Sequence, residues 1–372
     1  MKFTIKKEEI IQSLKKINVL LGKRTDLPIL SNILVIIKKN YLFLTSTNLE
    51  IEITTKTCLK PPFEIGKITI PGKKFLDICR SFPKKEKLTI LKKENKIIIT
   101  AKKIFFSLIT LPYKNFPIFP NKFKKKKNEF FISEKDFKKN IKYTNFCIAN
   151  SDVRHYLNGM LFEIKENYIR STSTDGYRIS TYKKKIKIEN LKESIIIPKS
   201  TINELSKILQ DKSSLIKISI FNKQNIRIKT NDLTFTSKLI DGEFPNCKNL
   251  FVQEKIKKKI TINTKKFQEA LYRISILCNE QFNGISLYIN NKNIKITSQN
   301  QKDEYAEEII EIIDQNDSNE INISINVNYI LDVLKVIKGT SLQLTINNDL
   351  SNIQIKDLEN SSSKYLIMSL LI

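Results

Sequence analysis

The stretch Tyr168–Thr181, YIRSTSTDGYRIST, contains two strand-like segments joined by a polar turn. Apolar and polar residues alternate on both sides, and Asp175-Gly176 is a dipeptide typical of tight turns. The same arrangement recurs in residues 41–53, YLFLTSTNLEIEI, and in residues 293–306, NIKITSQNQKDEYA. The recurrence suggests that the chain is built from repeats.

Other landmarks keep nearly the same spacing. The matched positions in copies one, two and three are Thr47, Thr174 and Gln299, then Leu30, Leu157 and Phe282; Pro71 with Pro198 and Phe116 with Phe244 match in copies one and two. A repeat of about 125 residues has the size of a domain rather than of a solenoid unit. We therefore expect three tandem copies of one domain, at residues 1–125, 126–253 and 254–372.

Composition limits the class of protein. The 372 residues are 41% hydrophobic, which is enough for each copy to bury a core. Five scattered cysteines without CxxC spacing argue against disulfides and structural zinc. The N-terminus has no apolar signal-peptide segment, and no window is long enough to span a membrane. A cytoplasmic protein is expected.

The formal net charge is +27. One interpretation is a polyanionic partner, most plausibly nucleic acid. The alternative is a bias of the whole chain towards lysine, since Lys, Ile and Asn are frequent everywhere. The lysine runs 124–127 and 183–185 fit a linker and a solvated loop, and the charge alone leaves both interpretations open.

Two amphipathic helices are predicted in each copy. The apolar faces of the first helices are Ile10, Leu14, Ile17 and Leu21; Phe137, Ile141, Thr144 and Ile148; and Phe267, Leu271, Ile274 and Cys278. The second helices begin at Lys73, Lys199 and Asn328, and Thr264 is the expected N-cap of the helix around Phe267. The opposite faces are rich in lysine and arginine. Such faces are either solvated or a polyanion-binding surface.

Short strands fill the rest of each copy. In copy one the alternation predicts strands at 31–38, 41–46, 49–56, 86–92, 96–101 and 104–111. The fold class is therefore α+β, with two helices of each copy packed on antiparallel sheets.

The sequence shows little sign of a catalytic site. The chain has one histidine, His155, and none of its eight glycines forms a phosphate-binding loop. Acidic pairs such as Glu307-Glu308 fit a solvated strand edge better than a metal site. We expect no cofactor, no metal and no catalytic residue.

Several segments together carry a resemblance to a known family. They are MKFTI at 1–5, KFLDICR at 74–80, DVRHYLNGMLFE at 152–163, TDGYRIS at 174–180 and FTSKLIDGEFP at 235–245. From end to end the chain closely resembles the DNA polymerase III β subunits, the bacterial sliding clamps. The resemblance implies a head-to-tail homodimeric ring of six domains that encircles duplex DNA. It also implies a non-catalytic role in polymerase processivity.

The resemblance implies three sets of site residues. The residues expected near DNA are Arg24, Lys73, Arg154, His155, Tyr156 and Lys199. The residues expected to line a pocket for partner peptides are Leu157, Thr174, Gly176, Tyr177, Arg178, Ile179, Pro245, Asn249, Leu250, Asn352, Leu366 and Met368. At the dimer interface, Phe106 is expected to meet the partner subunit's Ile276 and Leu277. The polymerase III α subunit, the clamp-loader δ subunit and other proteins with a clamp-binding motif are the expected peptide partners.

The chain departs from the family pattern at a few of these positions. His155 replaces a common tyrosine, Asn249 a common arginine and Asn352 a small hydroxyl residue, while Ser369–Leu371 replaces a Pro-Met ending. A pocket should persist, and peptide preference stays open. Two other functions remain as alternatives: a basic monomer that grips nucleic acid, and a nucleic-acid enzyme with an unrecognised site.

Overall fold

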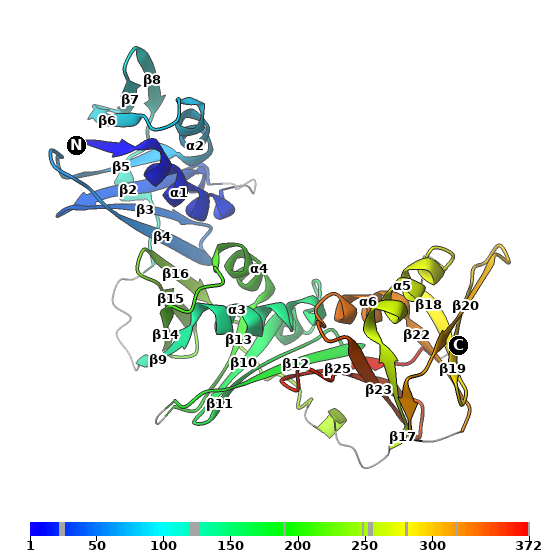
Figure 1. Cartoon of the computed structure of the whole chain (residues 1–372). Coiled ribbons are helices and arrows are strands. Elements are labelled where there is room, and N and C mark those ends of the chain that lie inside the picture. Colours follow the sequence, from blue (N-terminus) through cyan, green and yellow to red (C-terminus); the bar gives the residue numbers. More distant parts are fainter. Residues whose placement is uncertain are drawn as a thin grey trace. The chain divides into compact units, whose positions relative to one another are not determined.

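The computed structural model describes residues 1–21, 27–119, 127–188, 191–247, 249–251, 256–279, 282–316 and 319–370. It divides into two compact units (Figure 1). The first consists of Met1–Lys135 with Asn203–Leu239, and the second of Asp136–Ile202 with Ile240–Ile372.

The first unit contains two antiparallel sheets. The eight-stranded sheet has the order β5 (Gly66–Pro71), β2 (Asn32–Lys38), β3 (Tyr41–Thr47), β4 (Ile51–Cys58), β16 (Leu233–Lys238), β15 (Asn225–Lys229), β14 (Leu215–Phe221) and β9 (Lys127–Ser133). The four-stranded sheet has the order β1 (Lys2–Lys6), β6 (Lys87–Lys93), β7 (Lys96–Ala101) and β8 (Ile104–Ile109). Helices α1 (Lys7–Ile17) and α2 (Gly72–Ser81) pack against each other and against strands of the larger sheet.

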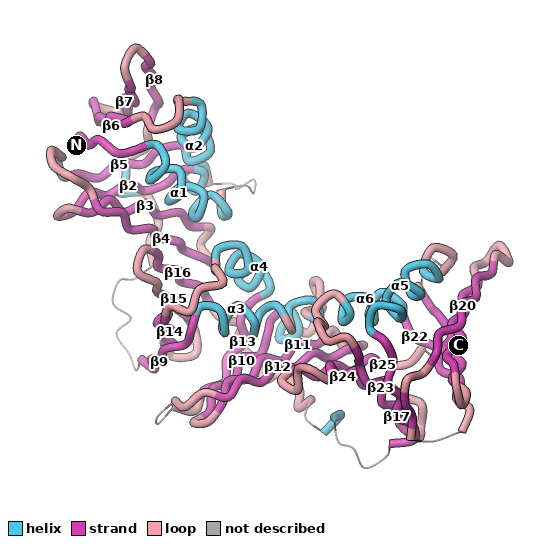
Figure 2. Tube along the Cα trace, viewed as in Figure 1, coloured by secondary structure: helices cyan, strands magenta, loops and turns pink. Residues whose placement is uncertain are grey.

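The second unit repeats this plan. Its larger sheet has the order β13 (Glu193–Pro198), β10 (Gly159–Lys165), β11 (Tyr168–Thr174), β12 (Arg178–Lys185), β25 (Ser363–Met368), β24 (Asn352–Asp357), β23 (Ser341–Asn347), β17 (Ile256–Asn263) and β21 (Asp314–Gln315). Its four-stranded sheet has the order β20 (Tyr305–Glu311), β19 (Asn293–Gln299), β18 (Gly284–Ile289) and β22 (Ile321–Asn326). Helices α5 (Thr264–Ser275) and α6 (Val327–Leu334) belong to this unit (Figure 2).

Two further helices, α3 (Glu134–Lys142) and α4 (Lys199–Ile208), cross the division between the units. The described residues thus contain six α-helices, two for each predicted copy, together with antiparallel sheets. The predicted α+β class is confirmed.

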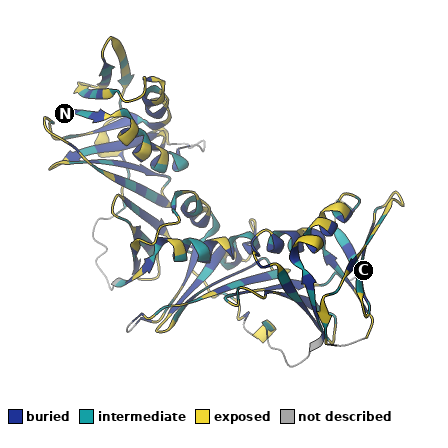
Figure 3. Ribbon diagram, in the orientation of Figure 1, coloured by how far each residue is buried: buried dark blue, intermediate teal, exposed yellow. Residues whose placement is uncertain are grey.

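The apolar helix faces are placed as predicted. All twelve face residues, from Ile10 to Cys278, are buried (Figure 3). The helices are shorter than the periodicity suggests, because α1, α3 and α5 end at Ile17, Lys142 and Ser275. The last predicted face residues, Leu21, Ile148 and Cys278, are buried although they lie beyond these helix ends.

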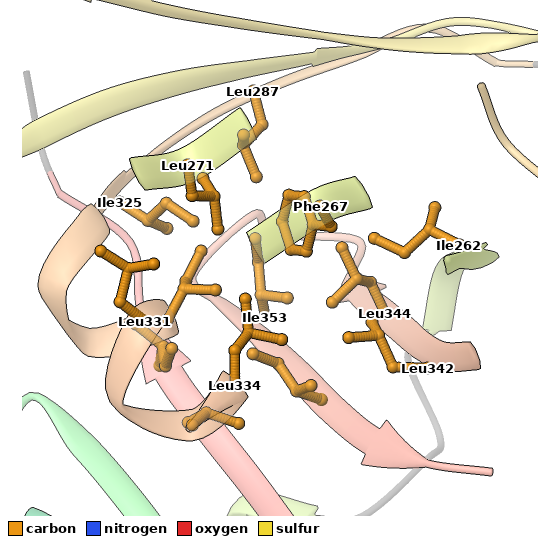
Figure 4. Close-up of a cluster of buried hydrophobic side chains, with 14 of the residues drawn as sticks. Ile262, Phe267, Leu271, Leu287, Ile325, Leu331, Leu334, Leu342, Leu344 and Ile353 are labelled. Carbon is orange, nitrogen blue, oxygen red and sulfur yellow. The ribbon is translucent and has the colours of Figure 1, made fainter. Parts of the chain in front are cut away.

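The core of the third copy shows how the helices cover the sheets. Phe267 and Leu271 of α5 meet Leu331 and Leu334 of α6 (Figure 4). Strand residues complete the cluster, among them Ile262, Leu287, Ile325, Leu342, Leu344 and Ile353. Removing so many apolar side chains from water is the main stabilising contribution to such a core.

Two details differ from the prediction. Strand β5, Gly66–Pro71, was not among the strands predicted in copy one. Glycine and proline at its ends suggest a turn, and pairing with β2 makes the segment a strand. The N-cap of α5 is Asn263 rather than Thr264, because the Asn263 side chain accepts a hydrogen bond of 2.9 Å from the Lys266 amide.

The five cysteines are all free thiols. Cys58 is exposed and the other four are buried. Burial raises the pKa of Cys79 to about 12 and that of Cys247 to about 11, so these buried thiols stay protonated and unreactive at neutral pH.

Candidate functional site

The turn between β11 and β12 is fixed by its own side chains. Asp175 Oδ1 accepts hydrogen bonds of 3.1 Å from the amides of Tyr177 and Arg178. Gly176 has a φ of +93°, a conformation in which a side chain is strained. The sequence Asp-Gly therefore suits this turn, as expected from the pattern.

Arg178 ties this turn to two other elements of the second unit. Its guanidinium donates to Asp175 at 2.9 Å, to Asp332 of α6 at 2.8 Å and to the carbonyl of Phe146 at 2.8 Å. It also lies 4.4 Å from the ring centroid of Tyr329. Such a planar fork of donors fixes position better than a lysine ammonium can.

The charge on Asp332 is stabilised by these contacts. Partial burial acts to raise the pKa of its carboxyl, but the hydrogen bonds from Arg178 and Lys335 outweigh burial and keep the pKa below the usual value. The Arg178–Asp332 ion pair is therefore charged at neutral pH, and it holds α6 against the turn.

Strand β25 lies beside β12 and brings the end of the chain to the turn. Ile179 pairs with Leu366 in the sheet, and the Met368 amide donates to the Tyr177 carbonyl at 2.8 Å. Ile179, Leu366 and Cys247 form a buried cluster on which Phe244 and Phe251 pack.

Exposed apolar side chains flank this cluster. Tyr177 is 64% exposed, Leu250 46% and Met368 36%. Gln354, which pairs with Leu366, donates to the Leu250 carbonyl at 3.4 Å. The turn, β25 and the short helix Asn249–Phe251 are thus linked. We call Tyr177, Leu250 and Met368 with the buried cluster the apolar surface.

The other expected peptide residues lie on connected elements. Asn352 is buried opposite Met368 in the sheet, and its amide donates to Ser351 Oγ at 3.0 Å. Thr174 pairs with Ile179. Pro245 and Asn249 are exposed on either side of Cys247, and Leu157 is buried just before β10.

The loop 152–158 holds three of the residues expected near DNA. The Arg154 guanidinium donates to both carboxylate oxygens of Asp152 at 3.0 Å, while His155 is exposed and Tyr156 half-buried. The loop lies against two glycines in segments that carry residues of the apolar surface: Gly176 precedes Tyr177, and Gly242 precedes Phe244. A Cβ atom on Gly176 would lie 3.1 Å from Arg154 Nη2, and one on Gly242 would lie 3.6 Å from Tyr156 Cβ.

These contacts bring two predicted sets of residues together. The loop that carries Arg154 and Tyr156 packs directly against the turn at Gly176 and against the segment that leads to Phe244. The two sets adjoin in the sequence at Tyr156 and Leu157, and the contact of Arg154 with the turn at Gly176 joins them a second time through tertiary structure.

Lys199, Lys73 and Arg24 differ in their situations. The Lys199 ammonium donates to the Ile148 carbonyl at 2.6 Å and to Asn150 Oδ1 at 2.6 Å, so it serves the structure of the preceding loop. Burial, together with the charge of Arg178, lowers its pKa. Lys73 is exposed on α2. Arg24 lies outside the described residues.

Many basic side chains on the helix fronts have acidic neighbours. The pairs are Arg80 with Asp77, Lys207 with Glu204, Lys265 with Glu269, Arg273 with Glu308, and Lys335 with Asp332. Local pairing lowers the positive potential that the bare count of lysines and arginines suggests. The positions that stay free of such pairs are therefore more informative than the net charge.

The expected interface residues lie near two sheet edges. Phe106 lies on the edge strand β8, half-buried, with its ring 5.6 Å from that of Phe82. Ile276 and Leu277 directly follow α5, and Ile276 is 77% exposed.

The described residues offer no grouping of His, Cys, Asp or Glu that could hold a metal ion. Glu307 and Glu308 pair instead with Lys295 and Arg273, at 2.7 and 2.6 Å. Within the same part of the chain, no helix is long and apolar enough to cross a membrane.

Comparison with known families accounts for this architecture. Three profiles of the DNA polymerase III beta subunit match in order: the N-terminal domain at residues 1–120, the central domain at 131–246 and the C-terminal domain at 249–371. The chain belongs to the DNA polymerase III beta subunit family.

Individual relatives match over their full length. The beta sliding clamp of Buchnera aphidicola subsp. Rhopalosiphum padi is 40% identical and covers 100% of both chains. That of Escherichia coli K12 is 34% identical over 99% of both chains. Among solved structures, a DNA polymerase III subunit beta from Pseudomonas aeruginosa is 33% identical, with a TM-score of 0.95 and complete coverage of both chains.

Among the described residues of the first unit, the apolar surface has no counterpart. By the repeat spacing, Glu52 stands in the place of Ile179, and Thr236, its strand partner, in the place of Leu366. Lys238 and Glu50 occupy the positions that correspond to Met368 and Tyr177, and their side chains form an ion pair of 2.9 Å. The same fold therefore presents an apolar surface at the β12–β25 junction and a polar surface at the β4–β16 junction.

Sequence reasoning missed the residues that hold Arg178. Asp332 is 154 positions away along the chain, and Phe146 is 32 away. An acidic residue on a helix front reads as solvated, so no signal in the sequence pointed to Asp332.

We expect Asp332→Asn to lower the stability of the second unit by about 2 kcal/mol at about pH 7, because Arg178 then loses a charged hydrogen-bond partner. Since the folded pKa of Asp332 is depressed, its contribution is present above the unfolded pKa of about 4 and is lost as the pH falls through the folded pKa. Thermal unfolding of wild type and variant at a series of pH values from about 7 to about 3 measures the difference in stability. The gap between wild type and variant should narrow with acidification, and the exposed control Asp314→Asn should show little effect. A gap that stays constant would contradict the assignment.

Proposed function

We propose that two copies of the chain close head to tail into a ring around duplex DNA and tether the replicative polymerase to it. The ring catalyses no reaction and acts in the cytoplasm. We place the domain boundaries at 125/126 and 253/254. Family membership and the sheet edges support the proposal.

The sheets of each predicted copy follow one rule. Every copy has two half-sheets of four strands, to which the third copy adds the two-residue strand β21 beside β17. One half-sheet of each copy ends in the equivalent strands β4, β12 and β20, and the other ends in β8, β16 and β25. Within the chain, β4 pairs with β16 and β12 pairs with β25. Only β20 and β8 lack such a partner among the described residues, so a second copy offers each the strand that the rule requires. This observation carries the proposal.

The two free edges are chemically suited to pairing. On β8, Phe105 is 62% and Ile109 72% exposed, and on β20, Tyr305 is 52% and Ile309 57% exposed. Phe106 is half-buried, whereas the equivalent Phe235 and Tyr365 at the two formed junctions are fully buried. Exposed apolar edge strands are unfavourable in a monomer and are normally covered.

The formed junctions also suggest a register. Phe235 lies opposite Ile53, and Tyr365 opposite Ser180. The same offset places Phe106 opposite the partner's Ala306, and Ser107 opposite the partner's Tyr305. Ile276 and Leu277 supply further apolar surface at the end of α5, and we assign them to the same interface.

The ring retains DNA by topology. Basic side chains attract phosphates without reading the base sequence, and closure prevents escape. We assign Lys73, Arg154, His155, Tyr156 and Arg24 to the DNA-facing surface. Lys199 is assigned a supporting role, because it holds the loop before Asp152.

The apolar surface binds partner peptides. Exposed Tyr177, Leu250 and Met368 beside a buried cluster suit a short segment with apolar anchors, and backbone edges and Asn249 offer polar contacts. Its residues are those predicted for the pocket, from Leu157 to Met368. The polymerase III α subunit, the clamp-loader δ subunit and other proteins with a clamp-binding motif share this surface.

Retention on circular DNA tests the ring. After loading onto nicked circles, the protein should stay bound at high salt and leave when the circle is cut, because salt removes electrostatic attraction but not topological linkage. Ile276→Asp should abolish retention by opening the interface, while Ile65→Asp, which changes another exposed isoleucine, should not. Equal loss from circular and linear DNA would mean that the protein grips DNA as an ordinary basic binder.

Truncation tests the peptide surface. Tyr177→Ala or Met368→Ala should weaken binding of a fluorescent peptide from the polymerase III α subunit about tenfold, since loss of an interface anchor costs about 1 to 2 kcal/mol. Fluorescence anisotropy measures the affinity, and Ile65→Ala is the control. Unchanged affinity in both variants would place the peptide elsewhere.

A further inference from the structure

The apolar surface continues into a row of basic side chains on the same face of the sheet. Successive residues of a strand point to opposite faces, so Ile179, Lys183 and Lys185 of β12 share one face. Ile179 belongs to the buried cluster of the apolar surface, whereas Lys183 and Lys185 are exposed. One face of β12 therefore has an apolar end and a basic end.

The two neighbouring strands extend the basic row. Lys364 of β25 lies opposite Thr181, two residues before Leu366 of the buried cluster. Lys356 of β24 lies two residues beyond Gln354, which pairs with Leu366. Both lysines are exposed. We define the basic strip as Lys183, Lys185, Lys356 and Lys364.

The lysines of the basic strip have no acidic partner within the described part of the chain. The Lys183 ammonium lies instead over the ring of Tyr168, 4.2 Å from its centroid. The neighbouring Glu163 is already paired with Arg170, at 2.7 Å. The basic strip therefore keeps its positive charge, in contrast to the paired cations of the helix fronts.

The first unit has only part of such a strip. Its corresponding positions, read from the strand registers, hold Lys56, Cys58, Lys229 and Thr234. Lys56 repeats the contact with an aromatic ring, at 3.8 Å from the centroid of Tyr41. Two of the lysines are thus replaced by uncharged residues at the junction that lacks an apolar surface. The complete strip accompanies the apolar surface.

The basic strip lies on the sheet face that points away from the helices. The alternate residues of β12 face the core, where Ser180 donates to the Tyr143 carbonyl and the Tyr182 ring stacks on that of Tyr143 at 4.9 Å. Tyr182 belongs to the same buried cluster as the apolar residues of α5 and α6. In the proposed ring the duplex passes the helix fronts, so the occupant of the basic strip is not the encircled DNA.

Distance and charge define an occupant. Lys183 is four residues along β12 from Ile179, which corresponds to about 14 Å at about 3.4 Å per residue. An extended peptide that is anchored on the apolar surface covers this distance with about four residues of its own. Aspartate or glutamate side chains in that part of the peptide would meet ammonium groups that have no other acidic partner.

We propose that the basic strip binds an acidic segment that flanks the apolar anchors of partner proteins. The inference rests on the proposed function, because such a partner must first hold the apolar surface. The anchors fix the position of the peptide, and the acidic flank adds electrostatic complementarity. The basic strip thereby favours partners with an acidic flank over competitors that carry the same anchors alone.

Two synthetic peptides test the basic strip. Both contain the clamp-binding segment of the polymerase III α subunit, extended at either end by a short spacer and by a run of glutamates in one peptide and of glutamines in the other. Fluorescence anisotropy at low salt should show about fivefold tighter binding of the glutamate peptide in one of the two orientations, since exposed charge pairs are individually weak. The preference should vanish at about 1 M salt, where the screening length is about 3 Å.

Lys183→Gln with Lys356→Gln should reduce this preference to about twofold and leave the affinity for the glutamine peptide unchanged. The matched control is Lys56→Gln with Lys229→Gln, which removes the exposed lysines at the corresponding positions of the first unit. It has the same net charge as the strip variant and should keep the wild-type preference. Equal effects of the two variants would indicate a diffuse positive field and overturn the proposal.

Three other outcomes separate the hypotheses. If wild type binds the glutamate and glutamine peptides equally in both orientations, the inference fails and the peptide surface stands. If it binds neither peptide, the apolar surface is not a peptide site, and the proposed function of that surface fails together with the inference. If the strip variant keeps the peptide preference but binds a single-stranded DNA oligonucleotide more weakly than the control does, the basic strip serves nucleic acid and the proposal is wrong.

Discussion

Strand pairing between successive repeats is the constraint on which the rest of the structure depends. Each repeat ends in a sheet edge whose amides, carbonyls and apolar side chains need a neighbouring strand. The chain meets this need twice, at β4–β16 and at β12–β25. The edges of β20 and β8 have no such partner strand among the described residues, and a second copy of the chain is the simplest way to pair both. Dimerisation thus follows from the same interaction that joins the domains.

The junction at β12–β25 also builds the apolar surface. Pairing puts Ile179 beside Leu366, and Arg178 anchors the turn to α6 through Asp332. At β4–β16 the corresponding pair is Glu52 and Thr236. The same backbone arrangement therefore occurs at both junctions, and the side chains there determine whether the surface is apolar or polar. This explains physically how a repeated fold carries an apolar surface at one of the two junctions that the described residues form.

The sequence predicted those features that depend on local periodicity. The repeat, the six helices and their buried faces follow from spacing alone, and the resemblance supplied the site residues. The contacts of Arg178 with Asp332 and Phe146 were not predictable, because they join residues distant in sequence. Nor was the engagement of Lys199 by the Ile148 carbonyl, since an isolated lysine on a basic helix front reads as a free cation. Tertiary contacts, rather than local pattern, determine which charges remain available.

Disulfide trapping across the proposed junction tests the central claim most directly. Ser107→Cys and Tyr305→Cys introduced together place thiols at positions predicted to face each other across β8 and the partner's β20, where directly opposed Cβ atoms are about 5 Å apart. Oxidation should give covalent dimers whose retention on circular DNA survives detergent. Ser107→Cys with Glu311→Cys, out of register, should not cross-link. Absence of the first product, or equal yields from both pairs, would contradict a ring closed by these two strands.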